Sequence, residues 1–199
     1  MVCFNIKYAG SFSQTASIFY IYSTQTPERT EIGADEVYSN LVNEIPKTSL
    51  PSGDDISDFF KELIREGYTH AIGVMISSGL SGTANSVKLM AEDFPEIETF
   101  IFDTKNLSMA EGILVVEAAK LLNQGKTYEE IVNILPTLRE TVDTYYIVDT
   151  LEYLIKGGRI GKVSGTIGQM LNLKPIISVN SDGIYYTIEK ARGIKQGYN

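Results

Sequence analysis

From about residue 35 onward, the chain alternates between segments with the pattern of a buried strand and segments with the pattern of a helix. The runs THAIGVMI (69–76) and ETFIFDT (98–104) are too apolar for a sheet with one face in water, and a helical pattern follows each of them. Parallel sheets have this signature because crossover helices cover both of their faces. The alternation therefore predicts an α/β fold, with a parallel-sheet α/β/α domain over residues 1–173 in which residues 1–30 are not assigned to an element.

Helical patterns flank these two runs along the chain. We expect helices over residues 34–45, 54–67, 83–94, 108–125 and 127–142, and one more strand over 144–150. Pro136 stands inside the last helix, where we expect a kink or a break, because proline has no N–H and its ring clashes with the preceding turn.

The pattern changes after residue 173. The strand-like segments KPIISVN and IYYTIEKARG flank Ser181-Asp182-Gly183, which is typical of a hairpin turn. Two strands alone are not stable in water, so the hairpin needs a further surface to pack against. We expect residues 174–199 to begin a second, smaller α+β domain, of which this chain contains only a part.

Composition argues against several classes of function. A net charge of −8 disfavours nucleic acid as a partner, and no apolar run is long enough to span a bilayer. The single cysteine, Cys3, cannot form an internal disulfide, which suits the cytosol. With one cysteine and one histidine in the chain, a metal site would have to consist almost wholly of carboxylates, so we expect no metal. We also expect no cofactor. The composition predicts a cytoplasmic protein.

Charge is distributed unevenly along the chain. Residues 1–149 carry 10 Lys and Arg against 22 Asp and Glu, whereas residues 150–199 carry 7 against 3. The basic segment KGGRIGK (156–162) contains two adjacent glycines, which indicate a turn with its basic side chains held outward. This basic quarter is either a face for an anionic ligand or an acidic partner, or a solvated surface with chance clustering of charge.

The segment ISSGLSGT (76–83), here called the glycine–serine loop, follows the first buried run and precedes a helix. Its Ser81 lacks the spacing of a G-x-S-x-G nucleophile elbow. The single histidine, His70, stands at the other end of the same strand, about 20 Å away at a rise of roughly 3.3 Å per residue. The loop also matches neither the P-loop nor the dinucleotide fingerprint. We therefore expect His70 to be structural and the protein not to be an enzyme.

The composition of the glycine–serine loop suits an anion. Gly79 and Gly82 allow backbone N–H groups to point outward, and the following helix adds a partial positive charge. The loop also offers four hydroxyl groups, those of Ser77, Ser78, Ser81 and Thr83. The alternative is an ordinary turn whose hydroxyl groups only cap the helix, and the loop alone does not decide between the two.

Two further segments belong to the same expected edge of the sheet. The TSLPS loop (48–52) is rich in hydroxyl groups and precedes a helix, and Asp103-Thr104 follows the second buried run. Ligands of open parallel sheets bind where such loops meet, at the carboxyl ends of the strands. If the strands are neighbours, these segments converge on the glycine–serine loop and strengthen the prediction of an anion site.

Six motifs then occur in an order that resembles the DegV family of bacterial fatty-acid-binding proteins. They are KTSLPS, ISSGLSGTANSV, IFDT, LEYLIKGGRI, MLNLKPIISV and GIYYTIEKARG, and the resemblance covers about residues 30–197. It implies a two-domain α/β protein that encloses one long-chain fatty acid in an apolar tunnel. It also implies that the protein is not itself catalytic but presents the carboxylate to a fatty acid kinase, which makes an acyl phosphate for phospholipid synthesis.

The resemblance assigns roles to particular residues. Thr48 and Ser81 match the hydroxyl groups that contact the carboxylate, and Gly82 matches the adjoining backbone donor. From the composition of the loops themselves, we also expect supporting contacts from Ser49, Ser78, Thr83 and Asp103. Contacts with the partner kinase or with the anion are implied for Arg159, Lys190 and Arg192.

Two departures from the family pattern set up an alternative. The DST-x-D loop near the family's N-terminus is absent, and the later glycine-rich loop with its histidine has no counterpart, because His70 does not match it. The sequence is therefore also consistent with a truncated, non-catalytic copy that acts as a self-associating or protein-interaction module through exposed apolar surface.

Overall fold

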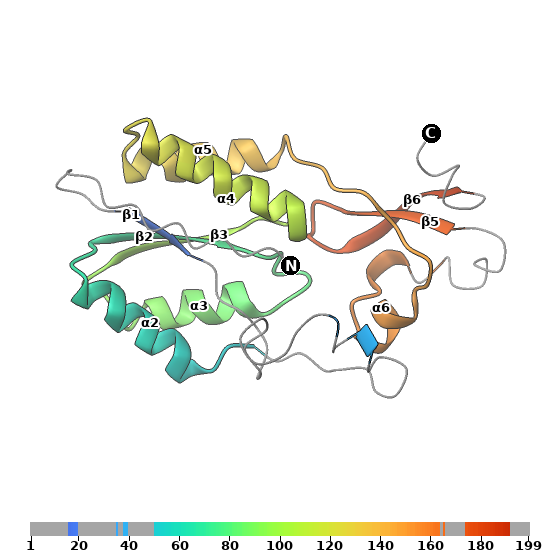
Figure 1. Cartoon of the computed structure of the whole chain (residues 1–199), viewed down its shortest axis with the longest axis horizontal. Helices are drawn as coiled ribbons and strands as arrows, with labels where there is room; N and C mark the ends of the chain where they lie inside the picture. Colours follow the sequence, from blue (N-terminus) through green and yellow to red (C-terminus); the bar gives the residue numbers. More distant parts are fainter. Residues whose placement is uncertain are drawn as a thin grey trace.

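The structure, a computed structural model, describes residues 16–19, 35, 38–39, 50–163, 165 and 174–191. Its strands form two separate three-stranded sheets (Figure 1). The elements are β1 (Ala16–Phe19), α2 (Gly53–Arg65), β2 (His70–Met75), α3 (Thr83–Ala91), β3 (Glu98–Asp103), α4 (Ser108–Asn123), α5 (Tyr128–Arg139), β4 (Tyr146–Ile147), α6 (Glu152–Lys156), β5 (Lys174–Val179) and β6 (Tyr185–Ala191).

The first sheet has the order β1-β2-β3, and all of its strands are parallel. Helices α4 and α5 cover one face of it and α2 and α3 cover the other (Figure 1). The predicted parallel α/β/α arrangement is therefore confirmed, and the helices expected between residues 54 and 142 correspond to α2 to α5. Strand β1 lies in the N-terminal segment to which no element was assigned. Of the helix expected over 34–45, only residues 35, 38 and 39 are described, and these are helical.

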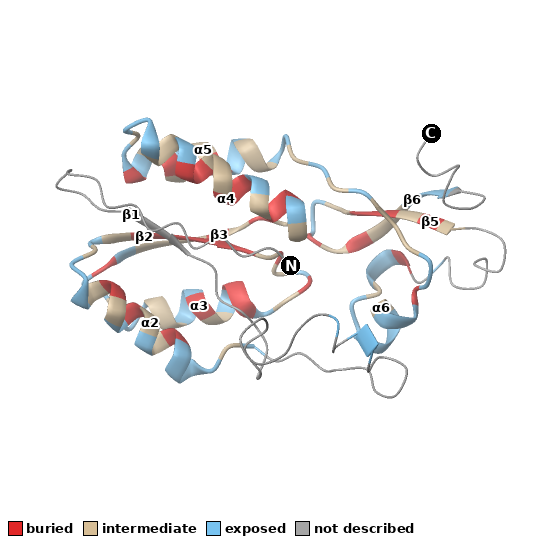
Figure 2. Ribbon diagram, in the orientation of Figure 1, coloured by how far each residue is buried: buried red, intermediate tan, exposed pale blue. Residues whose placement is uncertain are grey.

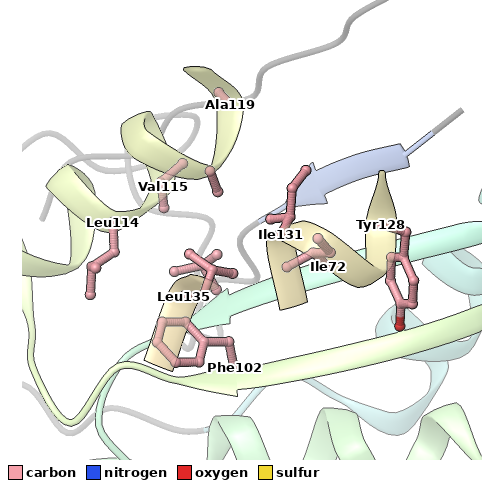
Figure 3. Packing of buried hydrophobic residues seen from close by; sticks show 10 residues of the cluster. Ile72, Phe102, Leu114, Val115, Ala119, Tyr128, Ile131 and Leu135 are labelled. Carbon is pink, nitrogen blue, oxygen red and sulfur yellow. The ribbon is translucent and has the colours of Figure 1, made fainter. Parts of the chain in front are cut away.

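Strand β2 is buried on both faces because it is the middle strand of this sheet. On one face, Ile72 and Val74 pack with Phe102 against the apolar sides of α4 and α5 (Figure 3). On the other face, Ala71 and Met75 pack against α2 and α3. Side chains of a strand alternate between faces, so one six-residue strand supplies both cores. Figure 2 shows the buried residues along the sheet and on the inner sides of the helices.

Helix α5 is not broken at Pro136 and runs from Tyr128 to Arg139. Of the two expected outcomes, the break is therefore wrong, and the kink stays a prediction. Pro136 is exposed, whereas Ile131 and Leu135 on the opposite side of the helix are fully buried in the core between α4, α5 and the sheet. Their packing offsets the roughly 3 kcal/mol that an interior proline costs a helix.

The second sheet has the order β4-β5-β6 and is antiparallel throughout. The hairpin predicted around Ser181-Asp182-Gly183 is confirmed: Gly183 has φ +77°, and the Asn180 side chain accepts hydrogen bonds from the N–H groups of Asp182 and Ile184. The strand expected over 144–150 is limited to Tyr146–Ile147, and it pairs with β5 and does not extend the parallel sheet. The division into domains 1–173 and 174–199 stays a prediction.

Candidate functional site

The glycine–serine loop lies at the carboxyl edge of the parallel sheet, beside the segment that follows β3. Met75 and Asp103 end their strands in register with each other. The Ser77 N–H then donates to the carbonyl of Asn106 at 2.8 Å, and the Thr104 hydroxyl donates to the carbonyl of Met75 at 2.8 Å. The two strand-end segments are therefore joined, as predicted for loops that follow neighbouring parallel strands.

Asp103 organises one side of the glycine–serine loop. Its carboxylate accepts from the N–H and the hydroxyl of Ser78 and from the N–H of Lys105, and it forms an ion pair with the Lys105 ammonium at 2.8 Å. Burial alone raises the pKa of this carboxyl, but the hydrogen bonds from Lys105 and Ser78 lower it below its ordinary value. Asp103 is thus an ionised group that fixes the loop, and its predicted proximity to Ser78 is confirmed.

Ser81, Gly82 and Thr83 form the other side of the loop. The hydroxyl groups of Ser81 and Thr83 lie 2.8 Å apart, and the Thr83 N–H donates to the Ser81 hydroxyl at 3.3 Å. Gly82 is the N-cap of α3 and offers no side-chain cap, whereas α2 and α5 each begin with a complete capping box. The structure therefore leaves the positive end of α3 less satisfied than the ends of α2 and α5, next to two hydroxyl groups.

The TSLPS loop reaches the glycine–serine loop through Leu50. A Cβ built on Gly82 would lie 3.3 Å from a methyl carbon of Leu50, so Leu50 packs directly on this glycine. The predicted convergence of the two hydroxyl-rich loops is therefore present at Leu50. Thr48 and Ser49 lie outside the described residues, and their contact with a ligand stays a prediction.

Ser77 connects the glycine–serine loop to the second sheet. Its hydroxyl donates to the carbonyl of Gly183 at 2.7 Å and accepts from the N–H of Gly79 at 3.1 Å, and the side chain is fully buried. A Cβ on Gly79 would lie 2.6 Å from the same Gly183 carbonyl oxygen, so only glycine allows this approach. The sequence predicted a hairpin turn at Gly183 but not the contact of this glycine with Ser77.

Arg159 is the basic residue of KGGRIGK that contacts the glycine–serine loop. Its Nε donates to the carbonyl of Leu80 at 3.2 Å, and Nη1 donates to the carbonyl of Gly157. Lys156 and Lys162 pair instead with the carboxylates of Glu152 and Asp182. Among the described residues, no carboxylate pairs with Arg159, so its charge is available beside the loop.

The other residues assigned to an anion or partner contact lie elsewhere. Lys190 is exposed on β6, where it stands in register with Pro175, and Arg192 lies outside the described residues. The structure thus brings Arg159 to the glycine–serine loop, and the roles of Lys190 and Arg192 stay predictions.

His70 lies far from the glycine–serine loop, as expected. It begins β2, at the end of the sheet opposite the glycine–serine loop, and its ring packs on Tyr128 with the ring centroids 4.9 Å apart. Its Nδ1 lies 2.9 Å from the Thr69 hydroxyl.

Within the described part of the chain, no group of three His, Cys, Asp or Glu side chains is placed to hold a metal ion. In the same part, no helix has the length and apolar character to cross a bilayer.

These features define a class of α/β protein in which the strand-end loop of a parallel sheet is bonded to the turn of a second, antiparallel sheet. The chain belongs to the DegV family, whose model, described as an uncharacterised protein of that family, matches residues 21–199.

Three relatives illustrate the similarity. A DegV domain-containing protein of Clostridium acetobutylicum is 54% identical over 169 residues, which are 85% of this chain and 60% of the relative. The fatty-acid-binding DegV family protein of Streptococcus agalactiae is 33% identical, with a TM-score of 0.78 over 85% of this chain and 60% of that one. The Streptococcus pneumoniae fatty acid kinase (Fak) B3 protein, solved with linoleic acid, is 26% identical, with a TM-score of 0.70 over 81% and 58% of the two chains. The chain spans about 60% of the length of these relatives.

Proposed function

We propose that this protein binds a long-chain fatty acid and holds its carboxylate at the glycine–serine loop. The observation that carries the proposal is the packing of Leu50 on Gly82. This contact brings the TSLPS loop to the N-terminus of α3, where the N-cap residue offers no side-chain hydrogen bond. Relatives with the same fold support the choice of ligand, because their names state fatty acid binding. This second line of support is independent of the contacts in this chain.

The proposed carboxylate site uses neutral donors. The Ser81 hydroxyl and the Gly82 N–H are the donors on the glycine–serine loop, with Thr48 as a further donor and Thr83, Ser78 and Ser49 around them. Neutral donors at a helix N-terminus bind a carboxylate without the desolvation cost of a fully buried ion pair. The chain supplies binding and orientation for the fatty acid and no catalytic group.

The proposed partner is a fatty acid kinase that phosphorylates the bound carboxylate. The name of the pneumococcal relative, which associates it with a fatty acid kinase, supports this part of the proposal. Arg159 has a charge with no described carboxylate partner and lies against Leu80, beside the proposed donors. A guanidinium group suits a kinase that carries nucleotide phosphates at its active site, because it binds phosphate well.

Lipid extraction from the purified protein, followed by mass spectrometry, tests the function. We expect a bound acyl chain, or binding of oleate or palmitate when either is added to the lipid-free protein. Absence of both results would contradict the proposal. A ligand-free dimer in size-exclusion chromatography with light scattering would instead favour the self-associating module.

Replacing Ser81 with alanine is expected to weaken fatty acid binding about tenfold, because one hydrogen bond to a charged group is lost, worth roughly 1.5 kcal/mol. The Gly82 N–H remains, so binding is not abolished. Isothermal titration calorimetry with palmitate measures the change. The matched control is Ser86→Ala, a serine on α3 outside the proposed site. Equal affinities of the wild type and Ser81→Ala would exclude Ser81 as a ligand.

A further inference from the structure

Polar atoms without partners gather on one face of the second sheet. Tyr146 on β4 and Thr187 on β6 both stand in register with Ile177 on the middle strand, so the three side chains point to the same face. Neither the Tyr146 hydroxyl nor the Thr187 hydroxyl has a hydrogen-bond partner among the described residues, and both atoms are buried. This face is the inner one, because Ile177 packs in the same cluster as Leu80 of the glycine–serine loop.

Helix α4 carries a further buried polar group without a partner among the described residues. Glu111, in the first turn of α4, is 4% exposed, and its Oε1 also has no partner in the part of the chain that the structure describes. Burial raises the pKa of Tyr146; the nearby Thr144 hydroxyl opposes this without reaching hydrogen-bond geometry, and the Glu111 carboxylate adds to it. Burial raises the pKa of Glu111 itself to about 8, so it is a neutral acid at pH 7.

Buried polar atoms without partners on one face of the sheet call for an explanation. Each buried polar atom without a partner costs about 1–3 kcal/mol, and most such atoms in native proteins bind something. Phenylalanine in place of Tyr146, valine in place of Thr187 and leucine in place of Glu111 would avoid this loss of stability at nearly the same side-chain volume. Hydroxyl groups and a protonated carboxyl group can each both donate and accept a hydrogen bond, so an uncharged hydroxyl or keto oxygen satisfies them.

We propose that this inner face, which carries Tyr146 and Thr187, hydrogen-bonds an oxygen substituent on the acyl chain. The ligand class is then a hydroxy or oxo long-chain fatty acid. The inference rests on the proposed function, because it requires the carboxylate to bind at Ser81. Leu80 precedes Ser81 and packs in the same cluster as Ile177. An acyl chain that runs from Ser81 past Leu80 therefore reaches this face.

The test compares the affinities of the protein for stearic acid and for a set of monohydroxystearic acids that differ in the position of the hydroxyl group. We expect one isomer to bind about tenfold more tightly than stearic acid, the gain from one satisfied hydrogen bond at roughly 1.4 kcal/mol. Tyr146→Phe and Thr187→Val should each reduce this ratio several-fold. Tyr145→Phe is the matched control, because Tyr145 is 62% exposed, and it should leave the ratio unchanged.

Each other outcome overturns the inference in a recognisable way. If stearic acid binds and no hydroxylated isomer binds more tightly, the proposed function stands and the inference fails. If the preference persists in both variants, the hydroxyl group binds elsewhere and the assignment to this face is wrong. If neither kind of acid binds, the proposed function fails together with the inference. Circular dichroism on each variant establishes that it is folded, and having two variants on different strands keeps the test open if one of them unfolds.

Discussion

The Gly183→Ala variant is expected to lose about 3 kcal/mol of unfolding free energy. Gly183 has φ +77°, a conformation that costs other residues roughly 1–2 kcal/mol. A Cβ at this position would lie 2.0 Å from the Ser77 hydroxyl oxygen and 3.1 Å from the Lys105 side chain, so the hairpin turn must move. Movement breaks the bond from Ser77 to the Gly183 carbonyl and leaves a fully buried hydroxyl without an acceptor, which costs about 1–3 kcal/mol more.

Urea unfolding of Gly183→Ala and of Gly67→Ala separates these two costs. Gly67 has φ +83°, and a Cβ there would meet nothing within 4 Å, so its variant carries the backbone cost alone. We expect Gly67→Ala to lose about 1 kcal/mol. The double variant Ser77→Gly/Gly183→Ala removes the atom that clashes, and its loss should be smaller than the sum of the single losses. Equal losses for Gly183→Ala and Gly67→Ala would show that the contact with Ser77 does not contribute.

The same variant should weaken the binding of fatty acid. Ser77 holds the N–H of Gly79 and the carbonyl of Gly183 with one hydroxyl, so displacement of the hairpin turn also releases the glycine–serine loop. A titration with palmitate, at a temperature where the variant is folded, measures this coupling. Unchanged affinity would mean that the loop keeps its conformation without the second sheet.

The parallel sheet and its helices could be predicted from the sequence because each of these elements has a hydrophobic pattern within its own residues. The stripe of Ile56, Phe60 and Leu63 predicts α2, and the unbroken apolar run of β2 predicts a strand with two buried faces. The contact of Ser78 with Asp103 followed from the same reasoning, because both residues end or follow neighbouring parallel strands. The strand at Tyr146–Ile147 was expected in the parallel sheet but pairs with β5 in the second sheet. Two residues are too few to show a hydrophobic period, and their partners on β5 lie about thirty positions further along the chain.

The contacts between the two sheets could not be predicted. Ser77 and Gly183 are separated by 106 positions, and their hydrogen bond depends on how the hairpin packs on the parallel layer. Glu111 presents the same difficulty: an acidic residue in the first turn of a helix is typical of an exposed position that favours the helix dipole. In this fold Glu111 is instead 4% exposed, and that burial depends on tertiary packing that the local sequence does not show.

Replacing Glu111 with glutamine is expected to remove most of the loss of stability between about pH 4.5 and pH 8. The pKa of this carboxyl rises from 4.5 to about 8 on folding, mainly because burial penalises the charged form. The native state therefore holds a proton that the unfolded state has released, and stability falls as the pH rises through this window. The fall reaches on the order of 4 kcal/mol at pH 8, at about 1.4 kcal/mol per unit of pKa. Tyr146, whose pKa is also raised, stays protonated throughout the window and adds no slope.

Urea unfolding of the lipid-free protein at several pH values from 4.5 to 8.5 measures the effect as a difference between the variant and the wild type. Glutamine imitates the protonated carboxyl, so the two proteins should be about equally stable at pH 4.5 and the variant should be more stable at pH 8. Other titrating groups cancel in this difference because both chains contain them. The matched control is Glu117→Gln on the same helix, where the carboxylate pairs with Lys120 at 2.6 Å near the surface. Its curve should follow that of the wild type, and a Glu111→Gln curve that also runs parallel to the wild type would mean that Glu111 is already ionised in the folded protein.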